Sequence, residues 1–254
     1  MKIRILGSGT SSGVPRIGGD WGQCDPAEPR NRRTRVSALV EHEDTRILVD
    51  TGPDMREQLL AAGTAKIDAV IWTHDHADHL HGIDDLRQVY HALGRPVQGY
   101  ARADTLATIE HRFGYVLHGK TGYPPTVSAQ LLPDHLSIGP ITVRVVEQPH
   151  GRIASAGLRF EAGGAAIGYA TDFHDLTPAM RQLYSGLDVW VVDALRRAPH
   201  PSHPTLDAVL SWVEELRPRR TVLIHMDQSM DYADLVRTLP AGVEPGYDGL
   251  EIAC

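Results

Sequence analysis

The 254-residue sequence has only two cysteines, Cys24 and Cys254, and few aromatic residues (6%). Two thiols are too few for a disulfide framework or a four-thiolate zinc site, which favours a reducing compartment. The scarce aromatic residues offer no stacking platform for single-stranded nucleic acid. The sequence also lacks an apolar run of about 18 residues and the apolar stretch of a signal peptide. These absences predict a soluble, cytoplasmic protein that contacts no membrane.

An excess of basic residues is missing as well: 25 Lys and Arg stand against 32 Asp and Glu, a net charge of −7. This balance disfavours a nucleic-acid partner, whose protein surface is usually basic. Arg30, Arg32, Arg33 and Arg35 form the one local exception, and either a solvated loop or a phosphate-facing patch explains them. No Pro-, Gly- or Ser-rich linker divides the chain, so we expect a single domain over residues 1–254.

Short runs rich in Val and Ile alternate with helical patterns along the chain. Strands are expected at residues 2–6, 36–41, 46–49, 69–72, 141–146, 166–170, 189–192 and 221–224. Helices are expected at residues 53–62, 82–93, 103–113, 177–184, 205–216 and 232–238. This order predicts an α/β protein with two sheets in one sandwich and helices outside.

Histidine is abundant, with 14 residues, and several stand where the expected strands end. Six apolar runs are followed by His or Asp, namely by Asp50, the segment His74 to His79, His150, Asp172, Asp193 and His225. Side chains at strand ends often converge in a site. A single Asp there is usually a turn or cap residue, and a single His is usually a hydrogen-bonded core or rim residue.

The segment 74–79 is different because it holds His74, His76 and His79 together with Asp75 and Asp78. Burying three imidazoles and two carboxylates together is costly unless a cation compensates them. Imidazole and carboxylate are ligands for zinc, manganese and iron. The segment therefore predicts a metal site.

Residues 73–82 (THDHADHLHG) resemble the H-x-H-x-D-H signature of the metallo-β-lactamase superfamily, and residues 6–15 (LGSGTSSGVP) narrow the resemblance to its PhnP-like phosphodiesterases. RNase Z and PqqB-type proteins are relatives of that group. The resemblance implies an αββα sandwich of two mixed sheets flanked by helices, with metal ions at one edge.

The resemblance also implies roles for individual residues. His74, His76 and His150 would hold one divalent ion, zinc or manganese, and Asp78, His79 and His225 a second. Asp172 would bridge the two ions. Asp172 and Asp78 would also count among the catalytic residues. Asp50 would orient ligand histidines without itself binding a metal ion. His203, in a Pro-rich loop over residues 196–205, would donate a proton to the leaving group, with His200 as the less favoured candidate. Cys24 stands alone after the Gly-rich loop, so we expect no structural zinc there and a loop held by Gln23, Asp25 and the Arg-rich turn.

The resulting interpretation is a metal-dependent hydrolase, a phosphodiesterase that opens a small cyclic phosphate or nucleotide-like phosphodiester with a metal-bridging hydroxide. The alternatives are a tRNA 3′-processing RNase Z, disfavoured by the acidic balance and the lack of an inserted basic arm, and a PqqB-like accessory protein without hydrolytic activity. The interpretation as a lactonase or β-lactamase is weaker, because those enzymes do not usually have the Gly-rich segment found here at residues 6–15. The expected partner is a small phosphodiester, and both a monomer and a homodimer are left open.

Overall fold

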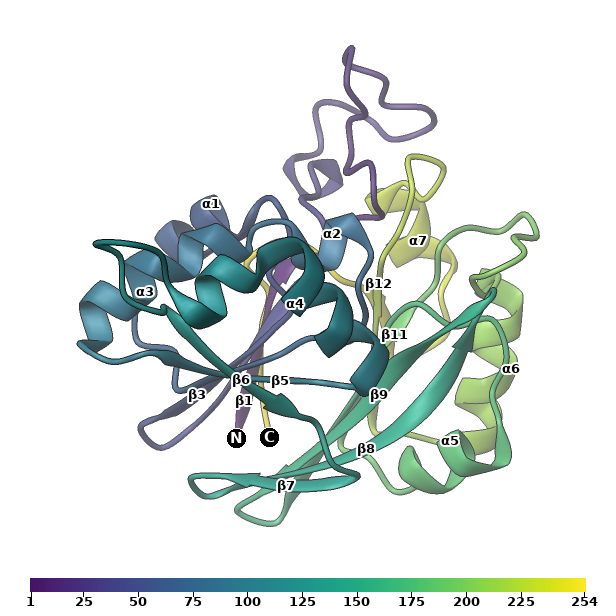
Figure 1. Ribbon diagram of the computed structural model, residues 1–254. Helices are drawn as coiled ribbons and strands as arrows, with labels where there is room; N and C mark the ends of the chain where they lie inside the picture. Colours follow the sequence, from purple (N-terminus) through teal and green to yellow (C-terminus); the bar gives the residue numbers. More distant parts are fainter.

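The computed structural model describes all 254 residues and builds them around two seven-stranded sheets packed face to face (Figure 1). The first sheet has the order β14-β1-β2-β3-β4-β5-β6 and the second the order β13-β12-β11-β10-β9-β8-β7. The first sheet contains β14 (Glu251–Ala253), β1 (Lys2–Gly7), β2 (Ser37–His42), β3 (Thr45–Val49), β4 (Ala69–Ile71), β5 (Val97–Ala101) and β6 (Val127–Leu131). The second contains β13 (Val243–Pro245), β12 (Arg220–Ile224), β11 (Val189–Asp193), β10 (Ala165–Ala170), β9 (Ile153–Ala162), β8 (Ile141–His150) and β7 (His135–Ile138).

Each sheet is mixed in the same way. Strands β1, β2 and β3 pair antiparallel and β3 to β6 pair parallel, while β7 to β10 pair antiparallel and β10 to β13 pair parallel. Strand β14 pairs with β1, so the two ends of the chain lie side by side (Figure 1). Parallel neighbours require crossover connections, and most of the helices lie in these connections.

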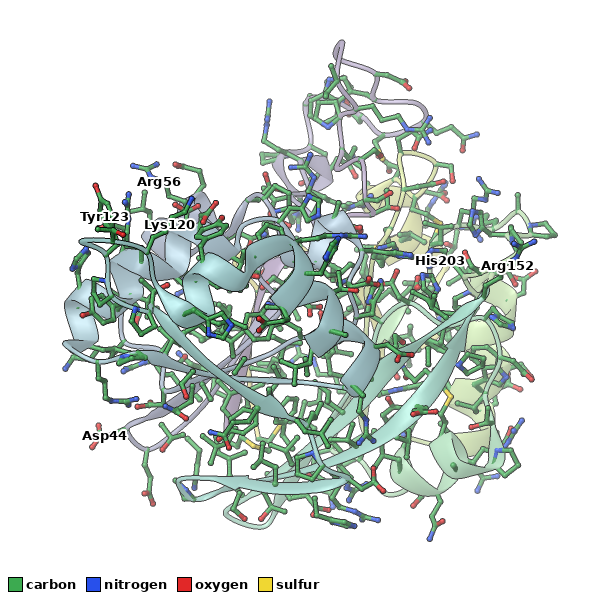
Figure 2. All side chains as sticks on the ribbon, viewed as in Figure 1. Asp44, Arg56, Lys120, Tyr123, Arg152 and His203 are labelled. Carbon is green, nitrogen blue, oxygen red and sulfur yellow. The ribbon has the colours of Figure 1, made fainter.

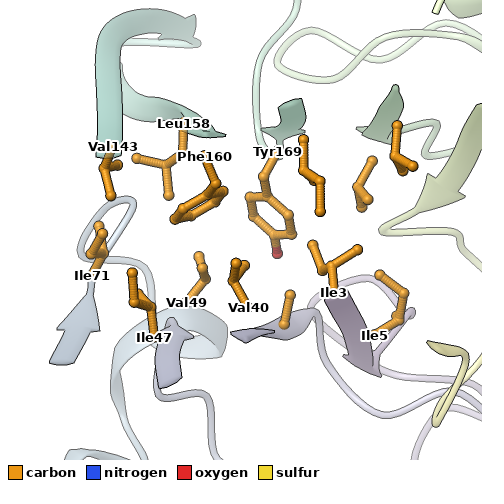
Figure 3. Close-up of a cluster of buried hydrophobic side chains, with 14 of the residues drawn as sticks. Ile3, Ile5, Val40, Ile47, Val49, Ile71, Val143, Leu158, Phe160 and Tyr169 are labelled. Carbon is orange, nitrogen blue, oxygen red and sulfur yellow. The ribbon is translucent and has the colours of Figure 1, made fainter. Parts of the chain in front are cut away.

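The core between the sheets is built by alternate residues of each strand, because successive strand side chains point to opposite faces. Ile3, Val40 and Ile47 of the first sheet face Phe160 and Tyr169 of the second (Figure 3). All are fully buried, and each such apolar side chain stabilises the fold by about 1.5–3 kcal/mol.

The outer faces of the sheets are covered by helices (Figure 1). The first sheet packs against α1 (Met55–Ala62), α3 (Leu86–Leu93) and α4 (Ala103–His118), which bury apolar residues over its outer face. The second packs against α5 (Pro178–Leu183), α6 (Leu206–Leu216) and α7 (Tyr232–Thr238). None of these helices combines the length and apolar composition that crossing a bilayer requires.

The predicted fold class is confirmed, but several predicted elements differ. The single helix expected at 82–93 is wrong: a 3-10 turn, η2 (Ile83–Asp85), precedes α3. At the start of this turn Gly82 packs so tightly on Gly52 that a Cβ on Gly82 would lie 2.1 Å from the Gly52 carbonyl oxygen, and the Gly82 amide donates to the Thr51 oxygen (2.7 Å). Helix α4 runs five residues beyond the expected end at Phe113, where its backbone is kinked.

Strands β5, β6, β7, β9, β13 and β14 were not predicted. Strand β5 shows why, because its central Gly99 weakens the strand pattern in the sequence. In the structure a Cβ at Gly99 would lie 2.5 Å from the ring of Trp72. The glycine therefore makes room for the tryptophan that directly follows the neighbouring strand β4, which local sequence does not reveal.

The segment between β1 and β2, residues 8–36, rises above one end of the sandwich (Figure 1). Arg33 fastens it, because its buried guanidinium donates to the backbone oxygens of Met230 (2.6 Å) and Asp227 (3.3 Å). The amide of Gln23 donates to the Gln228 oxygen and that of Asp25 to the Asp231 carboxylate.

The Arg-rich run is therefore not a free phosphate-facing patch. Arg30 pairs with Glu28 (2.7 Å) and Arg35 with Asp54 (3.0 Å), in addition to the buried Arg33. Only Arg32 is exposed without an ion-pair partner, with its guanidinium 5.8 Å from the Trp21 ring centre. The solvated-loop interpretation holds for Arg30 and Arg32 and fails for Arg33, which is 2% exposed.

Candidate metal centre

The polar residues that follow the strands do meet at one edge of the sandwich. Asp50 follows β3, Asp172 lies just beyond β10, and His225 follows β12. All three have left-handed backbones, with φ of 65°, 56° and 58°. This conformation is uncommon for residues other than glycine and concentrates at functional sites. It turns each chain sharply at the strand end, so that the side chain stays buried at the edge.

Seven side chains form two groups of potential metal ligands. The first group is His74, His76, His150 and Asp172, and the second is Asp78, His79 and His225; within each, the ligand atoms lie within 4.8 Å of one another. These are the seven residues expected from the sequence.

Asp172 links the groups because each carboxylate oxygen faces a different one. Its Oδ1 lies 3.5 Å from Nε2 of His150 and 3.8 Å from Nε2 of His74. Its Oδ2 lies 3.1 Å from Nε2 of His79 and 3.5 Å from Nε2 of His225. This is the arrangement that a carboxylate bridging two cations requires.

The short helix α2 (Ala77–Leu80) divides the signature segment between the groups. His76 precedes the helix with an extended backbone, whereas Asp78 and His79 lie in its single turn. The turn is held by the Thr51 amide, which donates to the His79 oxygen at 2.7 Å. Asp75 turns away and accepts a hydrogen bond from Thr108 of α4, so it belongs to neither group.

Asp50 lies behind the second group and contacts no ligand atom of the first. Its Oδ1 accepts from the Thr73 amide (2.7 Å) and its Oδ2 from the Thr73 hydroxyl (2.8 Å). Oδ2 also lies 2.7 Å from Nδ1 of His79. A carboxylate that accepts from the rear nitrogen of a ligand histidine fixes its ring orientation and tautomer. The orienting role predicted for Asp50 is consistent with these contacts.

The charges of the centre are organised for cations. Burial opposes ionisation of Asp172, yet the nearby imidazoles of His225 and His79 hold its pKa well below the usual range. Burial would likewise lower the pKa of His225, but Asp172, Asp193 and Asp78 raise that pKa to about 9. In the absence of a metal ion the carboxylates thus favour a proton on His225, whereas burial lowers the pKa of His74 and of His150.

The donor set fits divalent metal ions. Nε2 of His74, His79 and His225 is buried without a hydrogen bond, and all three atoms face carboxylates. Buried polar atoms left without hydrogen bonds are rare and require an explanation. Imidazole nitrogens beside carboxylates match the preferences of zinc, manganese and iron.

His203 lies beside the centre, at the upper right of Figure 2, and its side chain is 10% exposed. Its Nδ1 lies 2.7 Å from Oδ2 of Asp193, and its Nε2 is 3.8 Å from Oδ1 of Asp172. Its ring stacks on that of His225 at a centroid distance of 4.8 Å. His203 also forms a third potential ligand group with Asp172 and His225, so geometry alone permits a ligand role. His200 lies further out, where its Nδ1 accepts from the Ser202 amide.

Asp193 is one of the six strand-end residues noted in the sequence, but no role in the site was predicted for it. It ends β11 fully buried, and its Oδ2 accepts from the Asp172 amide (3.1 Å) while contacting His203. Its position at the end of a strand was the available signal. However, an Asp there usually caps a turn, and its contact with His203 depends on the path of the 196–205 loop.

The sandwich fold and its His/Asp clusters define a metallo-β-lactamase-fold hydrolase. Residues 45–226 match the family model of the beta-lactamase superfamily domain. The chain belongs to this superfamily. A solved diphosphatase of the PhnP family is 35% identical to the chain, with a TM-score of 0.91 over 100% of this chain and 97% of that one.

Other relatives are similar over less of their length or in fold alone. An octanoyltransferase of Porphyromonas gingivalis is 33% identical over 258 residues, which cover 99% of this chain and 51% of that protein. The chain thus spans about half the length of this curated relative. Zn²⁺-bound PqqB from Methylobacterium extorquens (19% identity, TM-score 0.82, 100% of both chains) and human tRNase Z, short form (18%, 0.71, 100% and 99%) share the fold.

Proposed function

We propose that the protein is a phosphodiesterase that requires two divalent ions, zinc or manganese, and acts on a small cyclic phosphate, nucleotide-like phosphodiester or diphosphate ester. The observation that carries the proposal is the carboxylate of Asp172, whose two oxygens face two separate groups of imidazole ligands. The likeness to a PhnP-family diphosphatase supports a phosphate ester as substrate. The net charge of −7 supports a small molecule as the partner in preference to a nucleic acid.

His74, His76 and His150 would hold one ion, Asp78, His79 and His225 the other, with Asp172 between them. When bound, such a pair of ions supplies a nucleophile at neutral pH and stabilises charge on the phosphoryl oxygens. Asp50 keeps the proton of His79 on Nδ1, so that Nε2 stays free toward the centre.

His203 would donate a proton to the departing oxygen. Asp193 accepts from its Nδ1, which fixes the orientation of the ring and directs Nε2 toward the centre. Pro199, Pro201 and Pro204 restrict the backbone of the loop that carries this histidine. Asp193 also accepts a hydrogen bond from the Asp172 amide. This second contact couples the position of His203 to that of the Asp172 carboxylate.

The test is a substrate panel with protein stripped by a chelator and then reloaded with zinc or manganese. Bis(p-nitrophenyl) phosphate, a nucleoside cyclic phosphate and a nucleoside diphosphate ester are compared with a phosphate monoester, a lactone and a precursor tRNA. We expect turnover of the diester class only, and only after metal is restored. Inactivity on every phosphate ester, or turnover that needs no metal, would refute the proposal. Preferred cleavage of the precursor tRNA would favour an RNase Z activity.

A further inference from the structure

The tight turn between β8 and β9 lies next to the metal centre. Strand β8 ends at His150 and β9 begins at Ile153, so Gly151 and Arg152 alone form the turn. The Gly151 backbone has a φ of 59°, and its amide donates to Nδ1 of His174 at 3.3 Å. Arg152 therefore has a fixed place in the fold, two residues after one of the histidines that would hold a metal ion.

The same turn packs against the loop that carries His203. Nδ1 of His150 donates to the backbone oxygen of Ser202 at 2.9 Å, and a Cβ on Gly151 would lie 3.4 Å from Cβ of Ser202. The ring centroids of His150 and His203 are 4.9 Å apart. Figure 2 shows Arg152 and His203 together on the right of the molecule. The Arg152 side chain thus begins beside the proposed acid, on the side of the centre where the leaving group would depart.

The guanidinium of Arg152 is exposed and makes no hydrogen bond or ion pair within the chain. The arginines of the adjoining loop are engaged, since Arg196 donates to two backbone oxygens of that loop and Arg197 pairs with Asp234 at 3.2 Å. The exposed carboxylate of Asp175 accepts from the amide of the next residue and receives no hydrogen bond from Arg152. A planar guanidinium with five N–H donors matches the oxygens of a phosphate. Arg152 is therefore free to bind an anion at this rim of the centre.

His200 adds a second donor on the same side. Its Nδ1 accepts from the Ser202 amide at 3.3 Å, so the hydrogen of the neutral ring is on Nε2. Its ring centroid lies 5.0 Å from that of His203. Neither residues 150–152 nor residues 196–205 include an Asp or Glu, although the whole chain has a net charge of −7. The two segments that border the leaving-group side thus offer donors and no carboxylate of their own.

We propose that Arg152, together with His200, binds a phosphate carried by the leaving group, so that the enzyme prefers esters whose leaving group is anionic. This inference rests on the proposed function and narrows its substrate class. In the hydrolysis, the oxygen of water bonds to the reacting phosphorus, the bond from phosphorus to the leaving oxygen breaks, and that oxygen takes up the proton. Because the leaving oxygen departs at His203, the atoms attached to it extend toward the 150–152 turn. The second phosphate there can belong to a diphosphate or to a phosphorylated alcohol, which present the same group to Arg152.

The first experiment compares three adenosine 5′-phosphate esters that differ only in the leaving group, which is methanol, methyl phosphate or 2-phosphoethanol. We expect the metal-loaded wild type to have a KM at least about 10-fold lower for the two esters with a charged leaving group, as for one charge-assisted hydrogen bond. A low KM for the methyl diphosphate alone would identify a diphosphate as the source of the second phosphate. A low KM for the 2-phosphoethyl ester alone would identify a phosphorylated alcohol.

The second experiment repeats the comparison with variants. Arg152→Met should raise the KM for the charged esters about 10- to 100-fold and that for the methyl ester less than about 3-fold, with a smaller effect on kcat. Arg152→Lys should recover part of the loss, because a lysine keeps the charge without the paired donors of arginine. His200→Ala should raise the same KM values by a smaller factor. Arg87→Met is the matched control, because Arg87 is an exposed arginine without an ion-pair partner on α3, and it should leave all three KM values unchanged.

The outcomes separate this inference from the proposed function. Equal KM values of the wild type for the three esters, or an Arg152→Met variant that raises all three KM values equally, would overturn the inference and leave the phosphodiesterase activity standing. No turnover of any phosphate ester by the metal-loaded wild type would overturn both. Elemental analysis of Arg152→Met should show the metal content of the wild type, which checks that the exposed substitution leaves the neighbouring His150 in place.

Discussion

Nδ1 of His79 lies 2.7 Å from Oδ2 of Asp50, and both side chains are completely buried. A carboxylate without a proton can only accept, so the hydrogen belongs to Nδ1 and Nε2 is left as a ligand atom. The same Oδ2 accepts from the Thr73 hydroxyl, which ties the pair to the start of the signature segment. One carboxylate thus sets both the tautomer and the direction of a ring 29 residues further along the chain.

The first prediction concerns this pair. Asp50→Asn should lower the affinity for one of two ions about 10- to 100-fold, because the amide is a weaker acceptor and His79 is less well oriented. Isothermal titration of metal into the stripped protein measures both affinities. Asp20→Asn, an exposed substitution in the segment between β1 and β2, is the control. Equal losses at both ions would contradict a role confined to His79.

The second prediction separates the bridging carboxylate from a ligand of one ion. Asp172→Ala should weaken both ions, because its two oxygens face different ligand groups, whereas His225→Ala should mainly weaken one. Elemental analysis after exhaustive dialysis gives the number of retained ions. Full occupancy in Asp172→Ala would show that this carboxylate is not a bridge.

The third prediction concerns the acid. His203→Ala should keep both ions and lose about 10²- to 10⁴-fold in turnover of an alkyl phosphodiester, but much less with a nitrophenyl one, whose leaving group needs little protonation. Asp193→Asn should show the same pattern in weaker form, and His200→Ala should be milder on both substrates. Loss of metal from His203→Ala would show that this histidine is a metal ligand, as its position in the group with Asp172 and His225 permits. Equal losses of turnover on both substrates would indicate that His203 binds the phosphate group and does not protonate the leaving group.

Part of this site could be predicted from the sequence alone. Asp50, Asp172 and His225 could be predicted as site residues, because each directly follows an apolar run, and this pattern is visible in the local sequence. Asp193 shares the pattern, but its function depends on a loop that returns ten residues later to bring His203 within 2.7 Å. Arg33 was one arginine among four in the sequence, and only the 227–230 backbone that it contacts makes it a buried cross-link. Such pairings depend on tertiary contacts that no periodicity encodes.

The fourth prediction concerns pH in the metal-free protein. Asp172, Asp193 and Asp78 raise the pKa of His225 to about 9 despite its burial, above the value of about 6.5 in an unfolded chain. Because the folded pKa is the higher one, protonated His225 stabilises the fold fully below about pH 6.5, and this stability is lost as the pH rises through about 9.

Denaturant unfolding of chelator-stripped wild type and His225→Gln, measured from pH 6 to pH 10, tests this. The difference in unfolding free energy should be greatest at about pH 6 and vanish near pH 10. A difference that grows with pH would mean that His225 is neutral in the metal-free fold.

The most direct test of the account is a titration of activity with metal. Stripped protein receives increasing equivalents of zinc or manganese, and hydrolysis of bis(p-nitrophenyl) phosphate is recorded at each step. Because Asp172 faces two complete ligand groups, we predict that activity rises until two ions per chain are bound and is constant thereafter. Activity that is complete at one ion per chain, or present with none, would contradict the two-metal centre.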